Sequence, residues 1–245
     1  ILNPFLINSA NEAFIVNQVF DKLFTFNDRN ELVPRIASRI TWCGDQKCLK
    51  VSIKNNVLFS DNDSLTVKDV KKSIGQSALI QGNGIAWALG NLVGFEDFIN
   101  RKTDNISGIK ISGIEKIEFE FKEKTPLFAQ FLATPYFFIS KKDVKGNWIG
   151  SGHYIVNAIT NDYIEIVSKN KADGVTSKWR FIKNISDKFD LSFIINSEHT
   201  EQKGISQKKY PLLQTTLAIF NLDSLKNKIS AAERCFLAKN LDISF

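Results

Sequence analysis

Two cysteines lie close together in the first quarter of the chain, where they could form a covalent link or hold a metal. Cys43 and Cys48 stand between residues 39–42 and 49–54, two predicted strands, the second of which alternates apolar with polar residues. A hairpin of these strands would bring the two sulfur atoms within reach of a disulfide. The third cysteine and both histidines lie far along the chain, which disfavours a metal site. A disulfide and two free thiols remain the main alternatives.

The residue types needed for catalysis are scarce. His153 and His199 are the two histidines, and neither accompanies a nucleophile elbow. The chain has no phosphate-binding loop, no glycine-rich dinucleotide motif and no His-Glu-x-x-His metal motif. Glu118 and Glu120 alternate with apolar residues, which predicts a solvent-facing side of a strand rather than a catalytic pair. We expect a binding protein with no catalytic residue, metal or cofactor; a hydrolase that uses either histidine is the least favoured alternative.

The composition is that of an ordinary globular protein. The chain has 245 residues, of which 43% are hydrophobic and 24% charged, enough to bury a sizeable core. Its 32 basic and 26 acidic residues give a net charge of +6, but the basic residues are scattered along the chain. Without a basic stripe interleaved with aromatic residues, we expect no nucleic-acid binding by this segment. No apolar run approaches the roughly 20 residues of a membrane-spanning helix.

Helix signals stand at three places. Ser9 and Glu12 have the spacing of a capping box, and Ala13 begins an apolar face that predicts a helix ending near residues 27–30. Residues 66–69 begin a second helix, predicted to break at Gly75 and at the glycine cluster 82–84. Residues 125–126 begin a third helix, with proline at its first position.

Strand signals alternate irregularly with these helices, which predicts a mixed α/β fold. The clearest strand is 117–121, where apolar and charged residues alternate. Further strands are predicted at 154–158, 163–167, 179–182 and 215–221, and a last helix at 230–241.

Several segments, taken in order, resemble the bacterial extracellular solute-binding proteins of family 5, the peptide- and nickel-binding components of ABC importers. An Asn-Pro pair precedes the first helix, as the family opens, and Lys22, Asn62 and His153 depart from the family's Gly, Gly and Pro. Asn62 can keep the left-handed turn that the family's glycine makes. His153 is interpreted as a structural loop histidine, with a metal ligand as the alternative. The matching segments are 19–23, 32–37 with Trp42, 51–61, 65–70, 108–121, 149–154 and 218–221.

The resemblance implies a type II periplasmic-binding-protein-like fold. Residues 1–40 and 141–245 would form a first lobe, and residues 41–140 an inserted α+β subdomain. Most of the second large lobe would be absent from the chain. Ligand would lie in the cleft between the lobes and be buried when they hinge together.

The resemblance also implies which residues face the ligand. Glu12 would lie near ligand, with the capping-box role as an equal alternative. Trp87 would present an aromatic ring, with a core tryptophan as the alternative. Asn221 would be a hinge or cleft-floor residue. The complete set of expected ligand-binding residues is Ser9, Asn11, Glu12, Ala13, Trp87 and Asn221.

The resemblance further implies a setting and partners. The expected ligand is a peptide or another small solute, and the expected protein partners are permease subunits of an ABC transporter. We expect a monomer in the periplasm or elsewhere outside the cytoplasmic membrane, with a lipid anchor as one form of attachment. The alternative is the ligand-sensing domain of a cytoplasmic transcription regulator, and oxidation of Cys43 with Cys48 would favour the exported protein because cytoplasmic thiols stay reduced.

Overall fold

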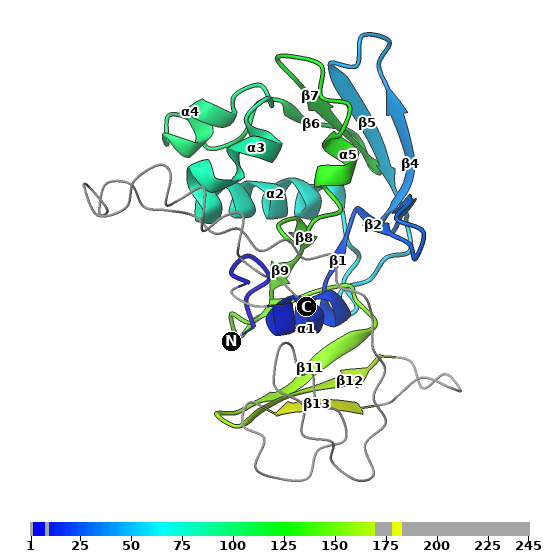
Figure 1. Ribbon diagram of the computed structural model, residues 1–245, viewed down its shortest axis with the longest axis vertical. Coiled ribbons are helices and arrows are strands. Elements are labelled where there is room, and N and C mark those ends of the chain that lie inside the picture. Colours follow the sequence, from blue (N-terminus) through cyan, green and yellow to red (C-terminus); the bar gives the residue numbers. More distant parts are fainter. Residues whose placement is uncertain (1, 8–9, 170–177, 183–245) are drawn as a thin grey trace, which may run out of the picture. The chain divides into compact units, whose positions relative to one another are not determined.

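The computed structural model describes residues 2–7, 10–169 and 178–182 (Figure 1). The predicted strand at 215–221 and the predicted helix at 230–241 lie outside these residues. So do Ser9, His199 and Asn221, and the side chain of Asn11. In the described part, no helix is both long and apolar enough to cross a membrane.

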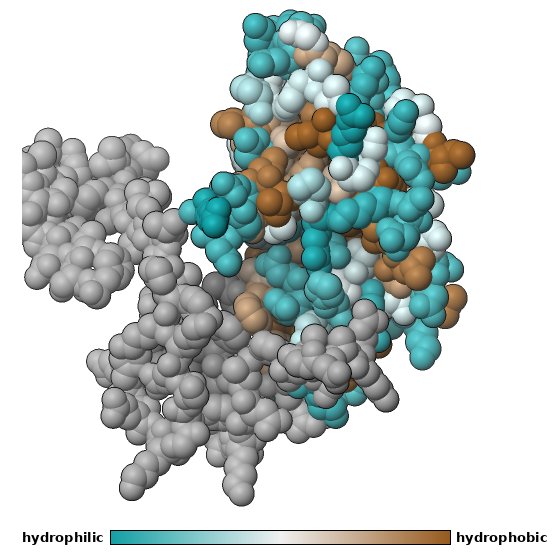
Figure 2. Space-filling view, turned by 90° about the vertical axis from the view of Figure 1, so that its right-hand side faces the viewer, coloured by the Kyte–Doolittle hydropathy of each residue, from teal (hydrophilic) through white to brown (hydrophobic). Residues whose placement is uncertain are grey.

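A four-stranded antiparallel sheet has the order β4-β5-β7-β6. Its strands are β4 (Ala37–Trp42), β5 (Cys48–Ile53), β6 (Ile109–Gly113) and β7 (Lys116–Glu120). Ile117 and Phe119 of β7 are fully buried, while Glu118 pairs with Lys50 at 3.6 Å and Glu120 pairs with Lys110. The predicted solvent-facing side of this strand is therefore confirmed. Figure 2 looks onto the side of the protein that carries β4, where hydrophilic residues separate small hydrophobic patches.

The helix α2 (Val67–Gln81) packs on the buried side of this sheet. The predicted start is confirmed, since the Thr66 amide donates to the Asp69 carboxylate at 2.8 Å. The predicted break at Gly75 is wrong, because buried Val70, Ile74 and Ala78 hold the helix on both sides of that glycine. The helix ends at Gly82, where φ is 52°. Short helical segments follow: η1 (Gly82–Ile85), α3 (Ala86–Leu89) and α4 (Phe95–Ile99).

The first helix, α1 (Ala10–Val19), ends earlier than predicted. The chain turns instead into β1 (Asp21–Lys22), which pairs with β8 (Phe138–Ile139), and then into β2 (Phe24–Phe26), which pairs with β3 (Leu32–Pro34). The helical spacing of the apolar residues extends beyond Val19, but pairing with a strand far along the chain overrides it. Long-range contacts of this kind leave no local signal.

The later part of the described chain is mainly strand. The third predicted helix forms as the single turn α5 (Phe128–Phe131), and β9 (Lys141–Lys142) pairs with β10 (Trp148–Ile149). The three strands predicted here are confirmed. They are β11 (Tyr154–Ile159), β12 (Tyr163–Ser168) and β13 (Lys178–Ile182), which form an antiparallel sheet in that order.

The buried residues form two hydrophobic clusters, which meet at the β1–β8 pair. The first contains the sheet β4-β5-β7-β6 and α2, and the second contains α1 and β11 to β13. Phe138 belongs to the second cluster and its neighbour Ile139 to the first. A two-residue strand therefore joins the two cores.

Candidate ligand-binding site

The start of α1 carries two of the expected ligand-binding residues. Glu12 and Ala13 are both half-buried, in the first turns of the helix. The Ala13 carbonyl accepts a hydrogen bond from the side-chain amide of Asn17 at 2.8 Å. Asn11 also lies in α1, while Ser9 lies outside the described residues, so the predicted capping box stays a prediction.

A glycine-rich loop packs against the other end of α1. The Gly152 amide donates to the Val19 carbonyl at 3.0 Å, and the Gly150 carbonyl accepts from the Ser60 amide at 3.0 Å. A Cβ atom on Gly150 would overlap Val19, and one on Gly152 would overlap Gln18, so both positions require glycine. The loop thus fixes the end of the helix whose beginning is the expected ligand face.

His153 follows this loop and is exposed. Its carbonyl accepts a hydrogen bond from the Lys169 amide at 2.9 Å. Across the described part of the chain, no group of three or more His, Cys, Asp or Glu residues is placed to hold a metal ion. The histidine therefore lies in the loop without a ligand set around it in that part.

Charged side chains connect the glycine-rich loop to β1. The Asp21 carboxylate accepts from Arg35 Nε at 2.8 Å and from the Ser151 hydroxyl at 3.4 Å. Lys169 donates to the Gly150 carbonyl at 3.4 Å, and burial lowers the pKa of its amine. These contacts join β1 to the glycine-rich loop.

Lys22 puts a long side chain where the family has glycine. It is 8% exposed, and its amine donates to Asn17 Oδ1 at 3.0 Å and lies 4.8 Å from the centre of the Phe138 ring. Burial lowers the pKa of this amine to about 8, while the nearby Asp21 carboxylate acts in the opposite direction. The sequence marked Lys22 as a departure but gave no sign that its amine is buried beside α1.

Trp87 belongs to an aromatic cluster that we call the Trp87 platform: Trp87, Phe131 and Tyr136. The Trp87 ring stands edge-on to those of Phe131 and Tyr136, with centroids 5.1 and 5.9 Å away. Trp87 is 50% exposed and Tyr136 is 43% exposed, so the core alternative for Trp87 is wrong. Sequence analysis missed Tyr136; the aromatic run in which it lies, residues 136–138, was the available signal.

The two parts of the expected site do not meet in the described residues. The Trp87 platform belongs to the region of α3 and α5, whereas Glu12 and Ala13 lie on α1, which packs with β11. Figure 1 shows α3 and α1 apart from each other.

The hairpin of β4 and β5 places Cys43 and Cys48 as the spacing predicts. Their Cα atoms lie 5.3 Å apart and the two sulfur atoms are bonded. The Cys43 amide also donates to the Cys48 carbonyl at 3.0 Å, which closes the turn. The structure thus holds the pair as a disulfide.

Comparison with protein families identifies this arrangement. The model of the bacterial extracellular solute-binding proteins, family 5 Middle, matches residues 31–180. The chain belongs to this family. The match includes most of the segments in which the resemblance was found, while 19–23 and 218–221 lie outside it.

Solved structures show the same fold at low sequence identity. The periplasmic murein tripeptide-binding protein MppA, in its unliganded open form, is 21% identical with a TM-score of 0.64. The match covers 74% of this chain and 39% of MppA. An oligopeptide-binding protein of Borrelia burgdorferi, OppAIV, is 20% identical with a TM-score of 0.62, over 74% of this chain and 40% of that one. The Listeria monocytogenes OppA bound to peptide is 13% identical with a TM-score of 0.62, over 73% and 39%.

These likenesses establish the mixed α/β, type II periplasmic-binding-protein fold expected for family 5. The chain spans about 39% of the length of MppA. No curated protein sequence matches the chain.

Proposed function

We propose that this chain is part of the solute-binding component of an ABC importer and that it captures a peptide outside the cytoplasmic membrane without chemical change. The observation that carries the proposal is the family 5 match over residues 31–180. Peptide as the ligand is supported by the names of the structural relatives, which include an OppA bound to peptide and a murein tripeptide-binding protein.

In this proposal the ligand lies against the start of α1. An extended peptide would be held mainly by main-chain hydrogen bonds, which give affinity with little dependence on side chains. Glu12 would lie near the peptide, Trp87 would offer an aromatic face, and Ser9, Asn11, Ala13 and Asn221 would line the cleft. The cleft would close between a lobe formed by residues 1–40 and 141–245 and a second lobe. The protein would act as a monomer, deliver ligand to permease subunits and be held near them by a lipid anchor.

The disulfide supports this setting over the cytoplasmic regulator. Structural disulfides persist outside the cytoplasm and are rare within it. Cys43 and Cys48 are bonded to each other in the structure, in the hairpin that joins β4 to β5. The regulator would instead carry reduced thiols and a DNA-binding domain.

The test is ligand retention by the full-length protein. We expect native mass spectrometry of the purified protein to show bound peptides, and titration of the stripped protein with a peptide mixture to restore them. Uptake of the retained peptides should also be lost when the gene is deleted. The proposal would be contradicted if the purified protein carried no peptide and the stripped protein bound none from the mixture.

A further inference from the structure

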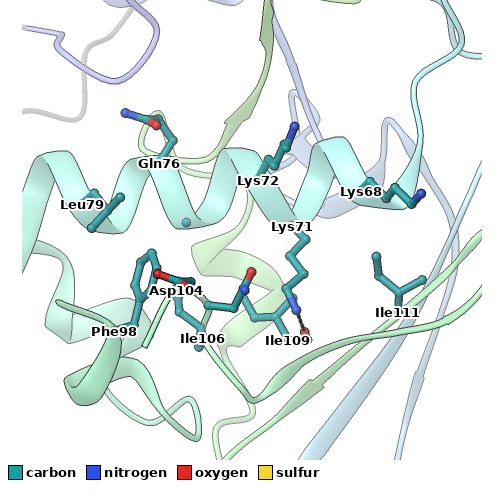
Figure 3. A pocket seen from close by; sticks show the side chains of 12 residues that line it. Lys68, Lys71, Lys72, Gln76, Leu79, Phe98, Asp104, Ile106, Ile109 and Ile111 are labelled. Atoms are coloured by element: carbon teal, nitrogen blue, oxygen red, sulfur yellow. Dashed lines mark hydrogen bonds between the residues drawn. The ribbon is translucent and has the colours of Figure 1, made fainter. Parts of the chain in front are cut away.

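A groove runs between α2 and β6, the strand at the free edge of the four-stranded sheet (Figure 3). Its volume is about 320 Å³, and it is open to solvent on one side. Phe98, Ile106 and Ile109 form a buried apolar floor. Leu79 and Ile111, which also line it, are 45% and 43% exposed. The groove therefore offers partly exposed apolar surface that a partner could bury.

Three lysines of α2 line this groove: Lys68, Lys71 and Lys72. Lys71 points across the groove and donates to the Ile109 carbonyl at 2.7 Å, as Figure 3 shows. No carboxylate of the described residues forms an ion pair with Lys68 or Lys72. Asp104 is the one acidic residue among those that line the groove. The groove thus has an excess of positive charge.

This placement of lysines is unfavourable for the helix itself. Lys68 lies in the first turn of α2, where the helix dipole disfavours cations. Lys68 is three and four residues from Lys71 and Lys72, so like charges are also neighbours on the helix surface. No ion pair in the described part of the chain offsets this repulsion, so the charges of Lys68 and Lys72 are available to a partner.

We propose that the α2 groove binds an acidic segment of a partner protein, with an apolar side chain on the floor and flanking carboxylates at Lys68 and Lys72. Charge complementarity selects this occupant, since the groove is basic and its floor is apolar. A second copy of this chain is disfavoured because the chain carries a net charge of +6. The groove is open to solvent on one side, which fits a segment that docks transiently rather than an enclosed small molecule. The groove is separate from the start of α1 and from the Trp87 platform.

The experiment uses the full-length protein and a fluorescent probe peptide, capped at both ends, of sequence Asp-Leu-Glu-Leu-Asp. Fluorescence anisotropy should show binding that weakens about tenfold in the double variant Lys68→Glu/Lys72→Glu. Leu79→Ser should weaken it about threefold, because it removes exposed apolar surface from the groove. The control Lys54→Glu/Lys124→Glu makes the same charge change at two exposed lysines outside the groove and should leave the affinity within twofold.

Four results would overturn the proposal. The first is no probe binding at millimolar protein, and the second is equal weakening in the control, which would mean a general charge effect. The third is binding to phosphatidylglycerol vesicles that depends on Lys68 and Lys72 without binding of the probe, which would make the groove a membrane contact. The fourth is probe binding that is lost in Trp87→Ala but kept in the lysine variants, which would place the probe in the ligand site. None of these results affects the ligand-retention test, so the two proposals fail separately.

Discussion

Lys22 is the residue whose chemistry departs most from its ordinary state. Its amine is enclosed by α1 and the Phe138 ring, with Asn17 as its hydrogen-bond acceptor. Burial disfavours the charged form, and the pKa falls from 10.5 to about 8. At neutral pH the protein therefore keeps a buried positive charge, which costs stability.

We expect Lys22→Met to stabilise the protein by about 3 kcal/mol at pH 7, because the pKa falls from 10.5 to about 8 and each unit of pKa shift corresponds to about 1.4 kcal/mol. Between pH 8 and 10.5 the unfolded chain binds more protons at this site than the folded protein, so wild-type stability rises with pH relative to the variant. The difference in free energy of unfolding between wild type and variant, measured by urea unfolding, should therefore be smaller at pH 9.5 than at pH 7. The control is Lys54→Met at an exposed site. A difference that stays constant with pH would show that the amine is not the cause.

The elements that sequence patterns predict well are those fixed by local signals. The alternation at 117–121 and the capping box at Thr66 lie within a few residues, and the strand and the start of α2 form as predicted. Asn62 adopts a φ of 69°, as its replacement of glycine predicts. By contrast, β1 pairs with a strand more than a hundred residues away, and Trp87 contacts Tyr136, which lies about fifty residues further along the chain. No local pattern carries such pairings, so the end of α1 and the aromatic cluster were missed.

The β4–β5 hairpin gives a prediction about redox state. We expect Cys43 and Cys48 of the native protein to resist alkylation until a reductant is added, with a mass change of two alkyl groups after reduction. Cys43→Ser/Cys48→Ser should lower the free energy of unfolding by about 2 kcal/mol, the cost predicted for a loop this short. Reductant should destabilise the wild type by the same amount and leave the variant unchanged. Two thiols that react in the native protein without reductant would contradict the disulfide.

The Trp87 platform gives a prediction about ligand. Exposed aromatic rings held edge-on by their neighbours are suited to binding because little side-chain entropy remains to be lost. We expect Trp87→Ala to weaken peptide binding by the full-length protein about tenfold, and Trp87→Phe to weaken it less. Leu127→Ala, a change at another exposed apolar residue of 55% exposure, serves as the control. Unchanged affinity in Trp87→Ala, with the thermal midpoint also unchanged, would remove Trp87 from the ligand site.

At the scale of the whole described unit, the two cores share one narrow connection. Phe138 is fully buried in the second cluster, and the centre of its ring lies 6.3 Å from that of Phe20. Its neighbour Ile139 is buried in the first cluster. Neither core can open at β8 without disturbing the other, so we expect them to unfold as one cooperative unit.

The variant Phe138→Leu tests this coupling. It should cost on the order of 1 kcal/mol, because the smaller side chain leaves space beside Phe20 and removes the ring over which the Lys22 amine lies. Hydrogen exchange should then become faster both in α1, from the second core, and in α2, from the first. Phe95→Leu, a buried change within the first core and away from β8, provides the comparison. If Phe138→Leu accelerates exchange in α1 alone, the β1–β8 pair does not couple the two cores.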